Sequence, residues 1–76
     1  MIRAYVTTIT GTGASVEAVD AIRALSGVTD PHVVSGDFDI VAEIEGQTVR
    51  DLQKIVTAEV HEVEGVGTTR TYIQMD

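Results

Sequence analysis

The stretch from Ser35 to Asp39 contains the residues best suited to bind a small charged molecule. Its two carboxylates, Asp37 and Asp39, are two positions apart, and side chains at that spacing in a strand point to the same face. Gly36 can adopt the positive φ that a tight turn requires, and such a turn leaves backbone N–H groups free. Two anionic acceptors beside free backbone donors suit a zwitterion such as an amino acid. The same residues also fit a purely structural role, with Asp37 in a turn and Asp39 at the start of a strand.

The remaining polar residues form no recognisable catalytic or metal-binding motif. The two histidines, His32 and His61, fall in different predicted elements, and a zinc site needs four well-spaced ligands in a chain that has no cysteine. Gly11-Thr12-Gly13 lacks both the third glycine of a dinucleotide-binding loop and the Gly-Lys-Ser/Thr of a phosphate loop. We therefore expect a protein that is not an enzyme and holds no metal or cofactor.

Hydrophobic spacing predicts the elements that must hold the glycine turn in place. Residues 2–9 alternate as a β-strand does. Ser15 is a suitable helix N-cap and Gly27 a suitable C-terminal stop, which predicts a helix over residues 16–26. The apolar stripe of this helix comprises Ala18, Val19, Ile22 and Leu25.

Two strands joined by the Ser35-Gly36-Asp37 turn are predicted next. Residues 28–34 form the first, and Pro31 favours an edge position because proline cannot donate to a strand ladder. Residues 38–45 form the second, which Gly46 ends. The expected core face of this strand comprises Phe38, Ile40, Ala42 and Ile44.

A second helix and a final strand complete the prediction. Thr48 is the expected N-cap, with Asp51 three residues later in a short variant of the capping box. Gly65 ends the connection to a last strand over residues 66–75. The apolar stripe of the second helix comprises Leu52, Ile55, Val56, Val60 and Val63.

The element order is β-α-β-β-α-β, and the two halves of the chain are alike. Gly27-Val28 after the first helix corresponds to Gly65-Val66 after the second. This order predicts one α+β domain over residues 1–76 with the ferredoxin-like fold, a four-stranded antiparallel sheet with both helices on one face.

The predicted fold leaves the second face of the sheet uncovered. A chain of 76 residues buries only about 60% of its unfolded surface, so it gains much from covering an apolar face. We expect this face to pack against a second copy in a sheet-to-sheet dimer, although a solvated face with a few tolerated aromatics is the simpler alternative. The face comprises Tyr5, Thr7, Ile9, Val41, Arg70 and Tyr72.

The charge balance argues against direct contact with nucleic acid. The chain has twelve Asp and Glu against five Lys and Arg, for a net charge of −7, and its cations are scattered singly. Such an acidic chain with a single lysine is typical of a high-salt cytosol. No secretory signal and no apolar run long enough to span a bilayer is evident, so we expect a cytoplasmic protein.

Several short motifs together resemble the effector domain of the Lrp/AsnC regulators, the leucine-responsive and asparagine-type transcription factors of bacteria and archaea. The chain has no counterpart of the helix-turn-helix that precedes this domain in the family, so it resembles a stand-alone regulation-of-amino-acid-metabolism (RAM) domain. The most specific element is the Gly-Asp-aromatic-Asp turn before an apolar strand. The resemblance is carried by Ala4-Tyr5-Val6, Gly27-Val28, Ser35-Gly36-Asp37-Phe38-Asp39, Glu64-Gly65-Val66 and Thr69-Arg70-Thr71.

The resemblance implies a sheet-packed dimer, rings of such dimers, and an amino-acid effector held between dimers near the glycine turn. The dimer contact would fall on Tyr5, Thr7, Val41, Arg70 and Tyr72. The effector site would fall on Ser35, Gly36, Asp37 and Asp39, with Thr69 and Thr71 as a looser match for a polar wall.

Two other functions remain open from the sequence. An enzyme of the dimeric α+β barrel type also packs two ferredoxin-like sheets, and it would show a deep pocket on the sheet face. A sensor would instead show its pocket at the rim, near Gly36. A ligand-free adaptor that joins full-length Lrp/AsnC regulators is the third possibility.

The net charge of −7 generates a prediction about salt. Self-repulsion destabilises a compact acidic domain, and assembly concentrates the charge further. Salt shortens the screening length from about 10 Å at 0.1 M to about 3 Å at 1 M. The melting temperature and the oligomer fraction should therefore both rise with potassium chloride, as followed by circular dichroism and light scattering. Equal stability at low and molar salt would contradict this expectation and the high-salt origin.

Overall fold

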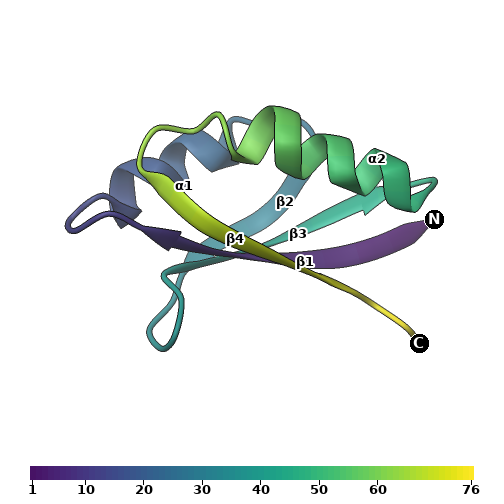
Figure 1. Cartoon of the computed structure of the whole chain (residues 1–76), viewed down its shortest axis with the longest axis horizontal. Helices are drawn as coiled ribbons and strands as arrows, with labels where there is room; N and C mark the ends of the chain where they lie inside the picture. The colour runs from purple at the N-terminus through teal and green to yellow at the C-terminus, as the bar shows by residue number, and fades with distance from the viewer.

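The predicted β-α-β-β-α-β order is confirmed by the computed structural model, which describes all of residues 1–76. Four strands form one antiparallel sheet in the order β2-β3-β1-β4, and both helical segments lie on the same side of it (Figure 1). None of the helices has the length and hydrophobicity that a bilayer span requires. The elements are β1 (Ile2–Thr10), α1 (Ser15–Arg23), β2 (Val28–Val33), β3 (Ile40–Gly46), α2 (Val49–Lys54), the π-helical η1 (Ile55–Val60) and β4 (Val66–Ile73).

The strand register separates a core face from an open face. Ala4 lies opposite Ile44 and Val6 lies opposite Ala42, and all four side chains are buried beneath the helices. The core is therefore small and aliphatic, with no aromatic side chain in it. Its members are Ala4, Val6, Ala18, Val19, Ile22, Val28, Ile40, Ala42, Ile44, Leu52, Val56, Val60 and Val63.

The two edges of the sheet differ. β2 is the edge next to β3, as Pro31 predicted, and its pairing with β3 is irregular between Thr29 and His32. Asp30 takes a positive φ of 46° within this irregularity. Such interruptions discourage further strand pairing at that edge.

The structure corrects the predicted ends of the first helix. Ala14 is the N-cap and provides no side-chain hydrogen bond, while Ser15 is already helical; α1 then ends at Arg23, three residues before Ser26. Gly27 is not a left-handed stop, because its φ is not positive. A Cβ at this position would lie 3.0 Å from both Glu59 Oε2 and Ile55 Cγ1. A larger residue here would push against these two side chains of η1, so the close approach of η1 favours glycine.

The second helix begins as predicted and then widens. Thr48 Oγ1 accepts from the Asp51 backbone N–H at 3.2 Å, and Asp51 Oδ2 accepts from the Thr48 N–H at 3.1 Å. Beyond Lys54 the hydrogen bonding becomes π-helical, as in the 3.0 Å bond from His61 N–H to Val56 O. The apolar stripe is confirmed, but the sequence did not predict the π turns. The buried residues of this stripe, Leu52, Val56 and Val60, are four residues apart. This spacing is longer than the 3.6 residues of an α-helical turn and fits the wider turn of a π-helix.

The predicted strands were too long around the glycine turn and at the C-terminus. β2 ends at Val33, β3 begins at Ile40 rather than Phe38, and β4 ends at Ile73 rather than Met75. Phe38 is half-buried and lies outside the core cluster, because the strand alternation does not extend back to it. The prediction that Phe38, the only phenylalanine, belongs to the core face is therefore wrong.

Candidate functional site

The connection between β2 and β3 projects from the sheet on the side away from the helices (Figure 1). The Val34 N–H donates to Asp39 O at 2.8 Å, and the Asp39 N–H donates to Thr8 O at 2.9 Å. Gly36 supplies the positive φ, 135°, that the sequence predicted for this turn. The backbone therefore closes a turn over residues 35–38 at the rim of the open face.

The Asp39 carboxylate holds this turn against the end of β1. Its Oδ2 accepts from the Thr10 backbone N–H at 2.8 Å and from the Thr10 hydroxyl at 3.2 Å. The contact is partly buried and involves an ionised acceptor, which makes such bonds stronger than neutral ones. Of the two alternatives for Asp39, the structure thus provides direct support for the structural role.

Asp37 lies differently, with its carboxylate exposed and in neither of the two ion pairs of the chain. It lines a cavity of about 250 Å³ between the turn and the open face. Arg70 of β4 lines the same cavity, so its lining includes one acidic and one basic side chain. The other lining residues are Thr7, Ile9, Phe38, Thr68 and Tyr72.

The five predicted dimer-contact residues share the open face. Tyr5 lies between Glu43 and Tyr72 in neighbouring strands. Thr7 lies between Val41 and Arg70 in the next row, so the five side chains are adjacent across three strands. Tyr72 remains 52% exposed. The placement on one face is confirmed, and their role as a contact stays a prediction.

Thr69 and Thr71 lie on the opposite side of β4 from this cavity. Thr69 is opposite Thr8 and its hydroxyl is 2.6 Å from His61 Nε2, while Thr71 is opposite Val6 and lines a groove beside α2. The structure therefore does not bring these threonines together with Asp37 within one chain. A ligand at Asp37 would reach such a threonine only if a second subunit supplied it.

The sequence missed two residues of the cavity. The sequence places Phe38 in the core and gives Thr68 no role, whereas both line the cavity. No local signal separates Phe38 from the core face, because it continues the alternation of Ile40 and Ala42. Thr68 offers no signal either, because it lies in a run of polar residues of similar type.

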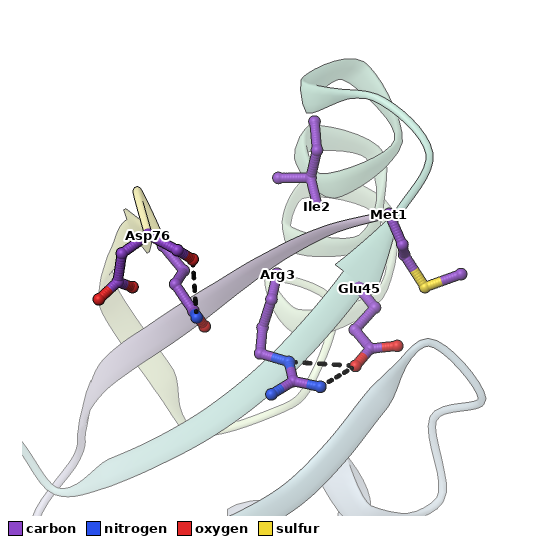
Figure 2. Close-up of a pocket in the computed structure, with 6 residues that line it drawn as sticks. Met1, Ile2, Arg3, Glu45 and Asp76 are labelled. Atoms are coloured by element: carbon purple, nitrogen blue, oxygen red, sulfur yellow. Dashed lines mark hydrogen bonds and ion pairs between the residues drawn. The ribbon is translucent and has the colours of Figure 1, made fainter.

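A larger cavity of about 410 Å³ lies at the other end of β1 (Figure 2). Arg3 Nε and Nη2 donate to Glu45 Oε1 at 3.1 and 2.8 Å, and this hydrogen bond and the Glu45 charge raise the pKa of Arg3 above its ordinary value. The two opposite charges already neutralise each other, which makes this cavity a weaker candidate for a charged ligand. No group of three or more His, Asp or Glu side chains in the chain is arranged to hold a metal ion.

Residues 4–76 match the family model of the Lrp/AsnC ligand-binding domain. The chain belongs to this family. The Lrp/AsnC domain is 34% identical over 56 residues to the leucine-responsive regulatory protein of Haemophilus influenzae, covering 74% of this chain and 34% of the relative. It is 32% identical over 57 residues to an uncharacterised helix-turn-helix-type transcriptional regulator of Pyrococcus furiosus, covering 75% and 38%. The matched part thus spans little more than a third of each of these two curated relatives.

Solved structures show the same fold. A Thermus thermophilus protein superposes with a TM-score of 0.91 at 29% identity, covering 100% of this chain and 95% of that one. A transcriptional regulator of Neisseria meningitidis, solved as an L-Met complex, superposes with a TM-score of 0.86 over 99% of this chain and 50% of its own. At 12% identity the second likeness concerns the fold alone.

The different surroundings of the two aspartates generate a stability prediction. Asp39→Ala removes the acceptor of two Thr10 hydrogen bonds and should lower the free energy of unfolding by about 1–3 kcal/mol. Asp37→Ala is the matched control, because its carboxylate is exposed and surface substitutions typically stay within about 0.5 kcal/mol. Urea unfolding measures both. Equal effects of the two substitutions would contradict the role of the Asp39–Thr10 hydrogen bonds in stabilising the fold.

Proposed function

We propose that this Lrp/AsnC domain is an amino-acid-sensing, self-assembling module of transcription control that does not itself contact DNA. The observation that carries the proposal is the position of the Ser35–Asp39 turn at the rim of the uncovered sheet face. A second copy that covers this face also approaches the turn. An effector bound there would therefore lie at a subunit contact and influence assembly.

The open face supports self-association. Tyr5 and Val41 are half-buried and Tyr72 is half-exposed without any helix over them. The core on the other face contains only aliphatic side chains, so a second layer adds stability that one small core lacks. The dimer of this proposal packs these faces together, and rings of dimers would bring the turns of one dimer to the Thr69 and Thr71 side of another.

The turn supports an amino acid as the effector. Asp37 offers an exposed carboxylate for an ammonium group, and Ser35 and Gly36 lie exposed beside it. Asp39 contributes by holding the turn through Thr10. A regulator of the same fold from Neisseria meningitidis was solved as an L-Met complex, which agrees with a ligand of this class.

The enzyme alternative receives partial support from the cavity. Thr7, Arg70 and Tyr72 belong to the sheet face, where an α+β barrel enzyme would have its pocket, but Asp37 and Phe38 belong to the rim. Neither histidine lines the cavity and the chain has no cysteine, so the cavity contains neither a hydroxyl–histidine nor a cysteine–histidine pair. This arrangement favours binding over catalysis.

A charge placed on the open face should prevent assembly. Wild-type protein is expected to scatter light at micromolar concentration with at least the mass of a dimer. Val41→Glu should reduce this mass to that of a monomer or unfold the protein, because it would bury an unpaired carboxylate in the contact. Val16→Glu is the control: Val16 is 65% exposed on α1, away from this face, and should keep the wild-type mass. A folded wild-type monomer would refute sheet-face assembly.

Calorimetry against the common amino acids tests the effector. At least one should bind the oligomer at millimolar concentration or below and change the distribution of masses in light scattering. Binding without any effect on assembly would argue for a different role of the site. If no amino acid binds the wild-type oligomer, the ligand-free adaptor becomes the better function.

A further inference from the structure

We propose that His32 is a proton-sensitive residue of the open face, and that its protonation strengthens the sheet-to-sheet self-association proposed above. The inference rests on that proposed function and adds a means of regulating it that needs no effector. It concerns the part of the open face at β2, whereas Arg70 and Tyr72 lie on β4 at the other edge of the sheet.

An extra residue in β2 decides which face His32 lies on. Thr29 lies opposite Glu43 and His32 lies opposite Val41, so three steps along β2 match two steps along β3. Without the extra residue, side-chain alternation from Thr29 would place His32 on the core face. With it, Pro31 is buried and His32 is exposed on the open face, in one cross-strand row with Val41.

The backbone of this irregularity is held in an uncommon conformation. Asp30 is the one residue other than glycine with a positive φ, 46°. Aspartate tolerates this conformation better than most residues, but still at a cost in free energy. Bulges at sheet edges commonly redirect a side chain. Here the result is an imidazole exposed on the face that a second copy would cover.

His32 shares a cavity of about 250 Å³ with two carboxylates, those of Asp30 and Glu43. Asp30 and His32 are exposed and Glu43 is half-buried, and none of the three belongs to either ion pair of the chain. The cavity therefore has two uncompensated negative charges when His32 is neutral and one when it is protonated. The other lining residues are Tyr5, Val41 and Ala42.

The nearest arginine on the open face already has an acidic partner. Arg3 of β1 donates to Glu45 Oε1 at 2.8 and 3.1 Å. This hydrogen bond, the Glu45 charge and then the Glu43 charge raise the pKa of Arg3, so one guanidinium is shared between two acids. Arg70 lies on β4, two strands beyond β3.

The remaining charged groups near β2 do not line this cavity. On α1, which packs against β2 from the core side, Arg23 donates to Asp20 at 3.0 Å and to Pro31 O at 3.4 Å. Asp37 follows β2 in the exposed turn and lines the other cavity of the open face. His32 is therefore the group of this cavity whose charge can change near neutral pH and offset the two carboxylates.

A second copy that covers the open face would remove this cavity from water. Burying charge costs less when opposite charges balance, so the covered form holds a proton on His32 more tightly than the separate chains do. Association then takes up protons. By linkage, its equilibrium constant is highest below the pH range in which an imidazole titrates and falls as the pH rises through that range. Each copy contributes one such cavity, so a dimer takes up two protons.

The pH dependence of self-association tests the proposal. Light scattering on a dilution series should give a dimer dissociation constant roughly tenfold lower, or more, at about pH 6 than at about pH 8. His32→Gln should remove this dependence and keep the dissociation constant near the wild-type value at the higher pH. His61→Gln is the matched control and should keep the wild-type dependence, because His61 lies outside the cavity, beside Thr69.

Two further variants test the direction of the charge effect. His32→Lys keeps a positive charge at both pH values and should give the tighter dissociation constant at both. Glu43→Gln removes one carboxylate of the cavity, so it should tighten association at the higher pH and weaken the pH dependence. Circular dichroism checks that each variant is folded, as expected for an exposed residue of an edge strand such as His32. Wild-type behaviour of both variants would overturn the proposal even if His32→Gln did not fold.

The outcomes separate this inference from the proposed function. Association that strengthens in acid equally in wild type and His32→Gln overturns the role of His32 and assigns the effect to the general loss of negative charge. A wild-type dissociation constant that is the same at both pH values also overturns the inference, and it leaves sheet-to-sheet assembly in place. A folded wild-type monomer at every pH refutes the proposed assembly and this inference with it.

Discussion

The hydrogen bonds from Thr10 to the Asp39 carboxylate are the constraint on which the site depends. They join the last residue of β1 to the residue that precedes β3, and so decide where the turn between β2 and β3 is held. Without them the turn would be held only by its flanking strands and by the backbone hydrogen bonds of Asp39 to Val34 and Thr8. With them, Asp37 and Phe38 are presented at the rim of the open face, beside the side chains of β4. The Asp39 carboxylate, by accepting from the Thr10 backbone and hydroxyl, thus fixes the turn that carries the exposed carboxylate of Asp37.

The helices and the core lie on one face of the sheet, which is why the proposed assembly and the proposed sensing share the other face. Both helical segments cover the same face of the sheet, and the core beneath them contains no aromatic residue (Figure 1). Both tyrosines and the phenylalanine lie outside that core, and Tyr5 and Tyr72 are neighbours on the open face. The three aromatic side chains therefore add nothing to the core of the single chain and are available to the contact proposed above. In that proposal, a ligand at the rim of this surface would change the free energy of self-association.

The arginines differ in whether they have an acidic partner. Arg3 and Glu45 form a cross-strand pair near one end of β1, and Arg23 pairs with Asp20 on α1. These exposed pairs are worth little to stability individually. Arg70 differs from these two arginines because it is in no ion pair. It lines a cavity together with Asp37, whose carboxylate is also outside the two ion pairs. Of the three cations outside the two ion pairs, Arg50, Lys54 and Arg70, only Arg70 lines this cavity.

Spacing and local backbone sterics in the sequence predicted the element order, the one-sided helices, the apolar stripes, the Thr48 capping box and the positive φ of Gly36. Strand alternation, which is also local, placed the five predicted dimer-contact residues on the open face. The other features depend on the tertiary structure. The approach of Glu59 and Ile55 favours glycine at position 27. The second helix widens into π turns over Ile55–Val60, and Asp39 accepts from Thr10, 29 residues away. Thr69 and Thr71, which were expected in the polar wall of the effector site, lie on the far side of β4, and Arg70 lines the cavity of Asp37 instead. Which residues meet across strands depends on register and long-range packing, and no local pattern encodes either.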